Sequence, residues 1–339
     1  MEYTVAFIEG DGIGPEQASA TKAVLAKLEE IKRLTLNLVP IEAGDRALKE
    51  HGEALSEESF DVIQKSDCCL KAPVGQSAFD VIIRLRRDLD LYANVRPAKA
   101  LPKVRCIGPP ETDLVIVREN TEDLYSGLES TDGEKATATR IITRKASRRI
   151  ATYAFELART RRKAVTAVHK SNVLKKTDGL FLLACKEVSE SYPDVQYSDM
   201  LVDAAAMNLI RNPKAFDVIV TTNMFGDILS DEAAQVVGGL GLVPSGNIGE
   251  HFALFEPVHG SAHDIAGRNI ANPTSLILSA AMMFEWLGRE KNDARASEAS
   301  RMIHTAVQQS LRSGEVTPDL GGNLSTVEMG NAIAGYISK

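Results

Sequence analysis

The segment "FDVIVTTNMFGDILSDE" at residues 216–232 decides the fold, because it joins a short apolar run to a helix. The run ends in polar residues, and two others end in the same way: "DLVIVREN" at 113–120 delivers Arg118, and "KAVTAVHKSN" at 163–172 delivers Lys170. Strands that alternate with helices predict an α/β fold with a substantially parallel sheet. Because ligands gather at the strand ends of such sheets, these polar residues are candidates for a binding site.

The alternation of strands and helices extends along the rest of the chain, which has 339 residues and is long enough for two domains or for one large doubly wound domain. The glycine-rich "VVGGLGLVPSGNIG" at 236–249 predicts a loop and a domain boundary. Apolar periodicity predicts strands at 4–9, 34–38 and 67–73, and helices at 15–31, 56–65, 79–90, 273–287 and 296–312.

Composition and charge exclude several classes of protein. The formal net charge is −7, so we expect no nucleic-acid partner, because a phosphate-binding surface needs a basic excess. The four cysteines form no C-x-x-C pair and are expected to be free thiols in a reducing compartment. The N-terminus lacks the pattern of a signal peptide, and no stretch is long and apolar enough to span a bilayer. We therefore expect a cytoplasmic protein without a membrane partner.

Two carboxylates, Asp227 and Asp231, lie four residues apart in the helix of the opening segment. On one helix face, such like charges destabilise by about 0.2–0.5 kcal/mol. A helix N-terminus would accommodate one of them. A divalent cation would remove the repulsion between both, and Mg²⁺ or Mn²⁺ prefers such oxygen ligands. Asp203, in "LVDAAAMNL", is either a further ligand or a helix N-cap.

Several arginines could converge on a small polyanionic acid, because arginine binds carboxylates through two parallel hydrogen bonds. The alternative for each of them is an ion pair with a neighbouring surface aspartate. The candidates are Arg84, Arg86, Arg87 and Arg96 in "RLRRDLDLYANVRP", and Arg118.

Other segments carry weaker signals. Lys170 and Tyr125 are candidates for an acid or a base with a shifted pKa, or are structural. The glycines of "GDGIG" at 10–14 do not have the G-x-G-x-x-G spacing, so the ordinary dinucleotide fingerprint is absent. "HGSAHDIAGRNIANP" at 259–273 is either a phosphate-binding loop of small residues or a plain loop.

Eight segments, in order along nearly the whole chain, together resemble the β-decarboxylating dehydrogenases, the family of isocitrate, 3-isopropylmalate, homoisocitrate and tartrate dehydrogenases. The resemblance implies an α/β fold of two domains that share a twisted mixed sheet without an ordinary Rossmann unit. A large, discontinuous cofactor-binding domain would comprise residues 1–95 and 240–339. A smaller domain, 96–239, would hold the metal, the catalytic residues and the interface of a homodimer. The segments are "GDGIGPE", "LDLYANVRPAK", "VRENTEDLY", "HKSNV", "VDAAAMNL", "GDILSDEAA", "LFEPVHGSAHDIAG" and "TPDLGGN".

The same resemblance implies catalytic and substrate-binding roles, residue by residue. Arg86, Arg96 and Arg118 would hold the carboxylates of a malate-type 2-hydroxy acid. Lys170 of the partner subunit would help to deprotonate the C2 hydroxyl, and Tyr125 would donate a proton after CO₂ has left.

The resemblance also implies a shared metal site. Asp227 and Asp231 of one subunit, with Asp203 of the partner subunit, would bind Mg²⁺ or Mn²⁺. The cation would lower the pKa of the alcohol and then stabilise the enolate left by decarboxylation.

Cofactor choice depends on Asp264, whose position in this family faces the adenosine ribose. A carboxylate there can accept both ribose hydroxyls and would repel a 2′-phosphate, so the expected cofactor is NAD. The other residues implied for the cofactor pocket are Glu256, His259, Gly260, Ser261, Ala262, Ile265, Asn272 and Asp319.

Ile82 and Ile83 precede the substrate arginines and, with Asn172 and Val173 of the partner subunit, would line the pocket for the group on the third carbon. An isopropyl group buried there would contribute about 1.5–3 kcal/mol, whereas a buried anion would be penalised. We therefore expect NAD-dependent oxidative decarboxylation of 3-isopropylmalate to 4-methyl-2-oxopentanoate and CO₂, a step of leucine biosynthesis.

Other functions remain as alternatives. Asp80 would repel the third carboxylate of isocitrate, whereas a register shift of one residue would bring Arg84 into the pocket and favour homoisocitrate. A catalytically silent binding protein would be expected to lack one of the catalytic or metal residues, and all are present. A nucleotide-binding reductase without a metal would leave the three aspartates unexplained.

Overall fold

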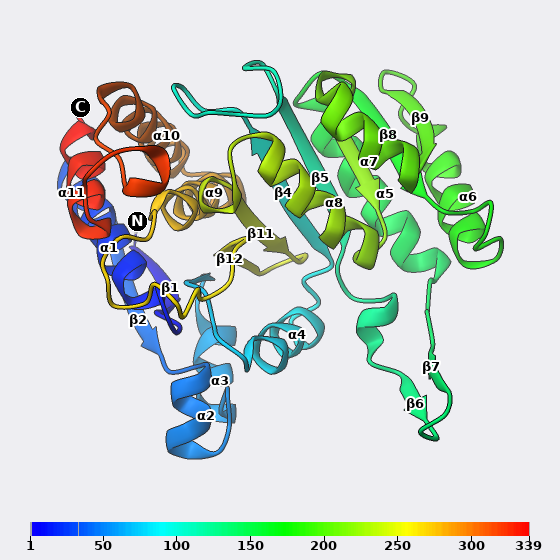
Figure 1. Cartoon of the computed structure of the whole chain (residues 1–339), viewed down its shortest axis with the longest axis horizontal. Coiled ribbons are helices and arrows are strands. Elements are labelled where there is room, and N and C mark those ends of the chain that lie inside the picture. Colours follow the sequence, from blue (N-terminus) through cyan, green and yellow to red (C-terminus); the bar gives the residue numbers. More distant parts are fainter. Residues whose placement is uncertain (1, 33, 339) are drawn as a thin grey trace.

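A ten-stranded mixed sheet runs through the whole molecule, a computed structural model that describes residues 2–32 and 34–338 (Figure 1). Its apolar strands are rich in Val and Ile, residues that favour a pleated and buried surface. In order across the sheet, the strands are β2 (Thr35–Ile41), β1 (Glu2–Ile8), β3 (Cys68–Lys71), β12 (Ala253–Pro257), β11 (Pro244–Ile248), β4 (Ala93–Lys99), β5 (Asp113–Glu119), β10 (Val218–Thr221), β8 (Ala164–His169) and β9 (Gln196–Leu201).

The two ends of this sheet run in opposite directions. Strands β2, β1, β3 and β12 are parallel to one another, and so are β5, β10, β8 and β9. Between them, β11 is antiparallel to both of its neighbours, and β4 is antiparallel to β5. The middle of the sheet therefore joins two parallel blocks, and β12 and β11, from late in the chain, fill the space between β3 and β4.

Helices cover both faces of the sheet and leave one central area uncovered by apolar side chains. On one face, the largest core includes side chains of α1, α5, α6, α9, α10 and α11. On the other face, α3 and α4 bury one smaller cluster, and α7 and α8 bury another. The helices are α1 (Gly14–Lys32), α2 (Asp45–His51), α3 (Glu57–Lys65), α4 (Ala78–Asp88), α5 (Arg144–Arg159), α6 (Thr177–Ser189), α7 (Val202–Arg211), α8 (Asn223–Val236), α9 (Thr274–Glu290), α10 (Ala294–Ser313) and α11 (Thr326–Tyr336).

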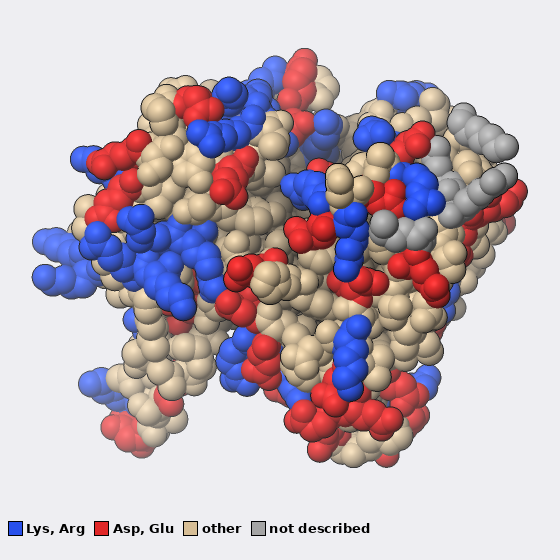
Figure 2. All heavy atoms as spheres, turned by 180° about the vertical axis from the view of Figure 1, so that it is seen from behind, with Lys and Arg blue, Asp and Glu red and all other residues tan. Residues whose placement is uncertain are grey.

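A small hairpin projects from the body of the molecule next to α5 and α6 (Figures 1 and 2). It consists of β6 (Glu129–Thr131) and β7 (Ala136–Ala138), and all of these residues are exposed. Figure 2 also shows that acidic side chains gather around α2 and α3, while lysine and arginine side chains gather over α5. In the part of the chain that the structure describes, no helix combines the length and the hydrophobicity needed to cross a bilayer.

The predicted elements are confirmed within a few residues, with one exception. The loop predicted at 236–249 is wrong in its second half, because Pro244–Ile248 forms β11, a fully buried strand at the centre of the sheet. Pro, Ser, Gly and Asn are poor strand formers, but pairing with β12 and β4 on both sides overrides that preference. The four cysteines are free, as predicted.

Candidate active site

The strand register places polar side chains in a row on one face of the central sheet. Residues that pair across strands point to the same face. Asn247 pairs with Asn94 between β11 and β4, and Asn94 pairs with Arg118 between β4 and β5. Lys71 and Glu256 lie two residues beyond the paired Cys69 and Leu254 of β3 and β12, and therefore share this face. The row fills the area that lies between the two smaller apolar clusters.

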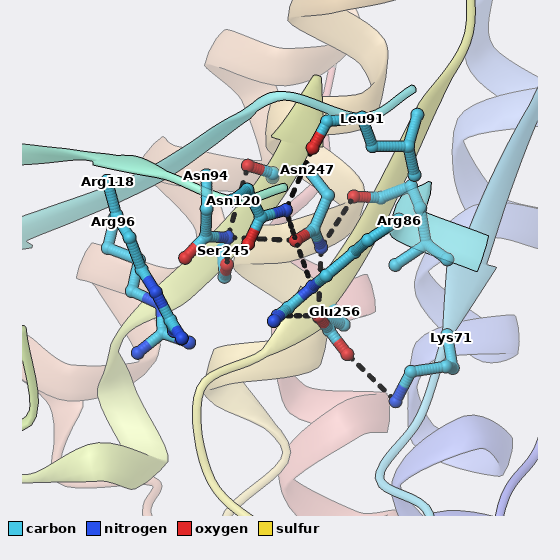
Figure 3. A network of polar contacts seen from close by, with 12 residues as sticks. Lys71, Arg86, Leu91, Asn94, Arg96, Arg118, Asn120, Ser245, Asn247 and Glu256 are labelled. Atoms are coloured by element: carbon cyan, nitrogen blue, oxygen red, sulfur yellow. Dashed lines mark hydrogen bonds and ion pairs between the residues drawn. The ribbon is translucent and has the colours of Figure 1, made fainter. Parts of the chain in front are cut away.

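Glu256 is at the centre of a buried polar network (Figure 3). Its carboxylate accepts from Lys71 Nζ at 2.8 Å and from Arg86 Nη2 at 3.3 Å. Arg86 Nε also donates to Asn247 Oδ1 at 3.0 Å. Burial favours the neutral acid, but the two cations outweigh it and lower the pKa of Glu256 to about 2. The carboxylate is therefore ionised at neutral pH and holds Arg86 in a fixed place.

Asparagine side chains extend the network toward β5. Asn120 and Asn94 donate from Nδ2 to Asn247 Oδ1 at 3.0 and 3.1 Å, and Asn94 Nδ2 also lies 2.8 Å from Ser245 Oγ (Figure 3). Asn120 Nδ2 donates in addition to the carbonyl of Leu91, at the base of β4. These bonds tie β4, β5 and β11 together on the polar face.

Arg96 and Arg118 lie beside this network and point at helix α8. Arg96 Nη1 is 2.7 Å from Ser230 Oγ and 3.3 Å from Asp227 Oδ1, and Arg118 pairs with Asp227 as well. Gly226 makes this approach possible, because a Cβ atom there would lie 2.6 Å from Arg118 Cγ. The helix therefore packs directly against the arginine side chains.

Both arginines retain buried donors without a partner. Within the described residues, Arg96 Nε and Arg118 Nη2 make no hydrogen bond although they are inaccessible to solvent. Burial and the two neighbouring arginines, Arg96 and Arg86, lower the pKa of Arg118 to about 9. Since a buried unmade hydrogen bond is costly, these donors and this excess of positive charge fit an anionic ligand with carboxylate groups.

Tyr125 faces the same carboxylate from the short 3₁₀ turn Leu124–Ser126. Its hydroxyl donates to Asp227 Oδ2 at 2.6 Å, and its ring centroid is 4.9 Å from Arg118 Cζ. Burial, reinforced by Asp227, raises the pKa of Tyr125. Burial opposes ionisation of Asp227, but Arg118 and Arg96 keep its pKa below the ordinary value. The phenol is therefore a proton donor beside a permanent carboxylate.

Asp231 is the second carboxylate on this face of α8, 3.5 Å from Arg96. Burial and the charge of Asp227 raise its pKa, which means that its environment favours added positive charge. In the described part of the chain, no group of three or more His, Cys, Asp or Glu side chains could hold a metal ion. The two aspartates fit a divalent cation as a partial ligand set that needs further oxygen ligands from elsewhere.

Lys170 and Asp203 form an ion pair with each other, away from the arginines. Their side chains are 26% and 55% exposed, and among the described residues no hydrogen bond or ion pair joins either of them to Asp227 or Asp231. Asp203 is in the first turn of α7, whose N-cap is Leu201, so the alternative reading of Asp203 as an N-cap is wrong. Nearby, Asn172 is exposed and Val173 is 65% exposed.

Helix α4 carries Arg86 on one side and Arg84 on another. Arg84 donates to the carbonyl of Leu55 and pairs with Glu57 at 2.6 Å, so its guanidinium is held near α3 and not beside Arg86. Ile82 and Ile83 are partly buried, and Phe79 is 56% exposed one turn earlier. The accessible side chains next to Arg86 on this helix are therefore apolar.

The two glycine-rich segments of the sequence lie against each other. Gly12 approaches Ser261 so closely that a Cβ atom would be 2.0 Å from the Ser261 carbonyl oxygen, and Ile13 N donates to that same oxygen at 2.9 Å. Gln17 Nε2 donates to the Asn272 carbonyl at 2.8 Å, which pins the far end of the 259–273 loop to α1. As expected, this loop contains no helix or strand.

Most of the residues predicted for the cofactor lie on or beside the 259–273 loop, whereas Glu256 lies on the central sheet. Asp264 is exposed, and within the described residues it makes no hydrogen bond or ion pair. Asn272 Nδ2 is bonded to Asp319 Oδ2 at 3.0 Å at the end of the loop. Glu256 instead belongs to the Arg86 network on the sheet. Most of the predicted set, namely His259, Gly260, Ser261, Ala262 and Ile265, lies on the 259–273 loop.

Sequence reasoning missed several members of the polar row. Lys71 had a detectable signal, because it is the one charged residue in the apolar strand "CCLK". Asn247 and Ser245 had none, because they lie in the segment predicted to be a loop. Asn120 ends a predicted apolar run, but an asparagine at a strand end is common and does not indicate a network, and Asn94 lies in β4, for which no strand was predicted.

The comparison of the sequence and that of the structure with known proteins both find members of one enzyme family. Residues 4–333 match the family model described as isocitrate/isopropylmalate dehydrogenase. A 3-isopropylmalate dehydrogenase of Sulfurisphaera tokodaii is 52% identical over 336 residues, which cover 98% of each chain. A homoisocitrate dehydrogenase of Methanocaldococcus jannaschii is 46% identical, covering 99% of this chain and 98% of the relative. The crystal structure of isocitrate dehydrogenase from Methylococcus capsulatus has a TM-score of 0.89 at 42% identity, covering 99% of this chain and 100% of the other.

Proposed function

Because the chain belongs to the isocitrate/isopropylmalate dehydrogenase family, we propose that it catalyses the NAD-dependent oxidative decarboxylation of 3-isopropylmalate, a reaction of leucine biosynthesis. One observation carries the reaction type: buried Arg96 and Arg118 direct unpartnered donors into a site that also holds Tyr125 and two aspartates. A 2-hydroxy acid with two carboxylates would satisfy those donors. Arg86, preset by Glu256, would complete the recognition of the carboxylates.

The substrate assignment is supported by helix α4. Ile82 and Ile83 present apolar surface one turn before Arg86, and Arg84 is held elsewhere by Leu55 and Glu57. A branched alkyl group on the third carbon fits that surface, whereas a third carboxylate would be desolvated against Ile82 and Ile83, which offer it no hydrogen bond. Asn172 and Val173, which are exposed, would complete the pocket from a second chain. The S. tokodaii relative, named for 3-isopropylmalate, also shares more sequence than the homoisocitrate enzyme.

Side chains of the protein would transfer the protons of the reaction. When bound to Asp227, Asp231 and a partner's Asp203, Mg²⁺ or Mn²⁺ would withdraw electron density from the hydroxy acid while NAD accepts a hydride. Lys170 would help to remove the proton of the C2 hydroxyl. Tyr125, whose pKa is raised, would supply a proton to the third carbon after CO₂ has left. Asp264 and the 259–273 loop would receive the adenosine end of NAD, with Asn272 and Asp319 at the end of that loop.

A homodimer with shared active sites is part of this proposal, because a single chain separates Lys170 and Asp203 from the arginines. Helices α7 and α8 pack together and expose large apolar side chains, which is the kind of surface that a second copy would cover. These are Met207, Ile210, Met224 and Ile228, which are 64%, 58%, 38% and 56% exposed.

We also propose that the expected division of the chain describes two bodies that meet around the substrate. Residues 1–95 and 240–339 would form the cofactor-binding body, and residues 96–239 would form the other. The reversal of strand direction between β4 and β5 supports a boundary in this part of the sheet.

The decisive experiment compares kcat/KM for 3-isopropylmalate, homoisocitrate, isocitrate and D-malate, with NAD or NADP and with Mn²⁺. We expect the highest value for 3-isopropylmalate with NAD, by about tenfold or more over the substrates with a third carboxylate, since an apolar pocket rejects an unpaired anion. A preference for isocitrate or homoisocitrate would refute the pocket assignment while leaving the reaction class intact. Full activity in chelator-treated protein would refute the metal site.

A further inference from the structure

Arg140 joins three separate segments through one guanidinium group. Its Nε donates to Asp123 Oδ1 at 2.5 Å and its Nη2 donates to Thr222 Oγ1 at 2.8 Å, while its Nη1 pairs with Asp178. Its Cζ also lies 5.0 Å from the ring centroid of Phe225. The Arg140 side chain is 12% exposed, and both aspartates are completely buried. One cation thus neutralises two buried carboxylates that have no other cationic partner in the described residues.

The contact of Arg140 with Asp123 fixes two elements of the candidate active site. Asp123 Oδ1 accepts from Leu124 N at 2.9 Å, at the start of the turn that carries Tyr125. Its other oxygen accepts from Met224 N at 3.2 Å, in the first turn of α8 that leads to Asp227. Asp123 has a φ of 74°, in the left-handed region that a non-glycine residue rarely adopts. The ion pair with Arg140 therefore holds a strained turn in the conformation that brings Tyr125 to Asp227.

The contact of Arg140 with Asp178 fixes a different element, the segment that follows β8. Asp178 Oδ2 accepts from the backbone N–H of Lys170 at 2.5 Å, at the point where the chain leaves β8. Arg140 binds the other oxygen of the same carboxylate. The Lys170 backbone is therefore anchored, through Asp178, to the same guanidinium as Tyr125 and α8.

We infer that Arg140 is a positioning residue for two active sites at once: it aligns Tyr125 and Asp227 in its own site and presents Lys170 to the site of the partner subunit. The inference rests on the proposed function, in which Lys170 acts across the dimer interface. The planar fork of arginine suits this role, because lysine has a single charged atom and cannot bond all three acceptors in fixed directions.

The first test compares Arg140→Lys with Arg161→Lys. Arg161 is a matched control, because it also bridges two aspartates, Asp113 at 2.7 Å and Asp217 at 2.9 Å, but at the opposite end of β5 from Arg118. Both variants should lower Tm. We expect R140K to lower kcat by about 100-fold, as for a displacement of catalytic groups by about 1 Å, with KM for the hydroxy acid changed less than threefold. R161K should keep kcat within about twofold. Equal kcat for both variants, per folded dimer, would overturn the inference.

Hybrid dimers then separate the effect of the Arg140–Asp123 contact from that of the Arg140–Asp178 contact. A Tyr125→Phe chain paired with a Lys170→Met chain should regain one complete site, about half of the wild-type activity per dimer. R140K paired with either of these chains should remain about tenfold below that level, because the remaining site has one catalytic group displaced, against both in each site of the R140K homodimer. Recovery in either R140K hybrid would show that Arg140 serves one site only and would overturn the inference. Absence of recovery in the Y125F/K170M control would instead refute the shared site of the proposed function, and the inference with it.

Asp178→Asn provides a second variant that retains the Arg140–Asp123 pair. It should disturb Lys170 alone. A D178N chain paired with Y125F should therefore recover activity as fully as the Y125F/K170M control, whereas D178N paired with K170M should not. The opposite pattern would contradict the assignment of the Asp123 contact to Tyr125 and of the Asp178 contact to Lys170, even if R140K itself failed to fold.

Discussion

Arg86 and the pair of Arg96 and Arg118 share the polar face of the sheet but differ in how their donors are bonded. Arg86 donates from Nε to Asn247 and from Nη2 to Glu256, and Arg86 and Lys71 together keep that carboxylate ionised. Arg96 and Arg118 instead leave buried donors unbonded beside Asp227. Arg86 Nε and Nη2 are thus bonded as the protein folds, whereas Arg96 Nε and Arg118 Nη2 have no partner within the described residues. From this difference we expect Arg96 and Arg118 to supply more of the substrate binding energy than Arg86, which Glu256 already holds.

The largest expected effect is on catalysis, from removing an unsatisfied arginine. Arg118→Met should lower kcat/KM for the hydroxy acid by about 10³-fold or more, because each charged hydrogen bond contributes about 1.5–3 kcal/mol and Arg118 also fixes Asp227. Steady-state kinetics with saturating NAD and Mn²⁺ measure this. Arg84→Met is the control, since Arg84, whose side chain is 22% exposed, pairs with Glu57 outside the site. Similar losses in both variants would show that the loss does not depend on the place of Arg118 in the site.

The next effect is on stability, from breaking the ion pairs of Glu256 with Lys71 and Arg86. A pKa of about 2 for Glu256, against an ordinary 4.5, corresponds to about 3 kcal/mol of folding free energy. Because the folded-state pKa is depressed, this contribution is fully present above about pH 5 and is lost as the pH falls toward 2. Glu256→Gln should therefore be less stable than the wild type at pH 7, and the difference should shrink on acidification in urea-unfolding experiments.

Glu119 offers a control of opposite sign for that experiment. It is also buried, but burial raises its pKa, since among the described residues no ion pair joins it to a cation. Its contribution to stability therefore grows as the pH falls through the folded-state pKa. If E256Q and E119Q showed the same trend with pH, the ion pairs of Lys71 and Arg86 would not be the cause of the depressed pKa.

The smallest effect concerns metal affinity. Because burial and Asp227 raise the pKa of Asp231, protons should compete with Mn²⁺ for this carboxylate at a higher pH than for an ordinary aspartate. Mn²⁺ affinity should fall as the pH is lowered, and Asp231→Asn should weaken binding by about 10- to 100-fold and flatten that pH dependence. Calorimetric titration with Mn²⁺ measures both. An unchanged pH dependence in D231N would place the proton-coupled ligand elsewhere.

Apolar patterning predicted many of the individual strands and helices, whereas the two-domain mixed sheet was implied by the family resemblance. Runs such as Val218–Thr221 are short, apolar and bounded by polar residues, and they became buried strands in the predicted places. Strand β11 could not be predicted in this way, because "PSGNI" has no local preference for a strand. Its conformation comes from β12 and β4, which are distant in sequence, so no window of residues around it contains the cause.

The candidate site was predictable as a set of residue types but not as an arrangement. The arginines and aspartates were identified from their spacing and from the family resemblance, and the structure does bring Arg96, Arg118 and Asp227 together. Which arginine is already satisfied depends on Glu256 and Lys71, whose positions follow from strand register across the sheet. Arg140 gave no sequence signal, because its partners Asp123 and Asp178 are separated from it by a hairpin and a whole helix.

The late placement of β12 and β11 between β3 and β4 also has a consequence for biosynthesis. A ribosome that has finished β4 at Lys99 must add residues up to Pro257 before the gap can be filled, roughly 10–30 s at ~5–20 residues per second. Until then the nascent chain exposes two unpaired strand edges and needs protection from aggregation. A product released early, before Asn247 and Glu256 are made, also lacks the groups that hold Arg86, so incomplete translation yields no active enzyme.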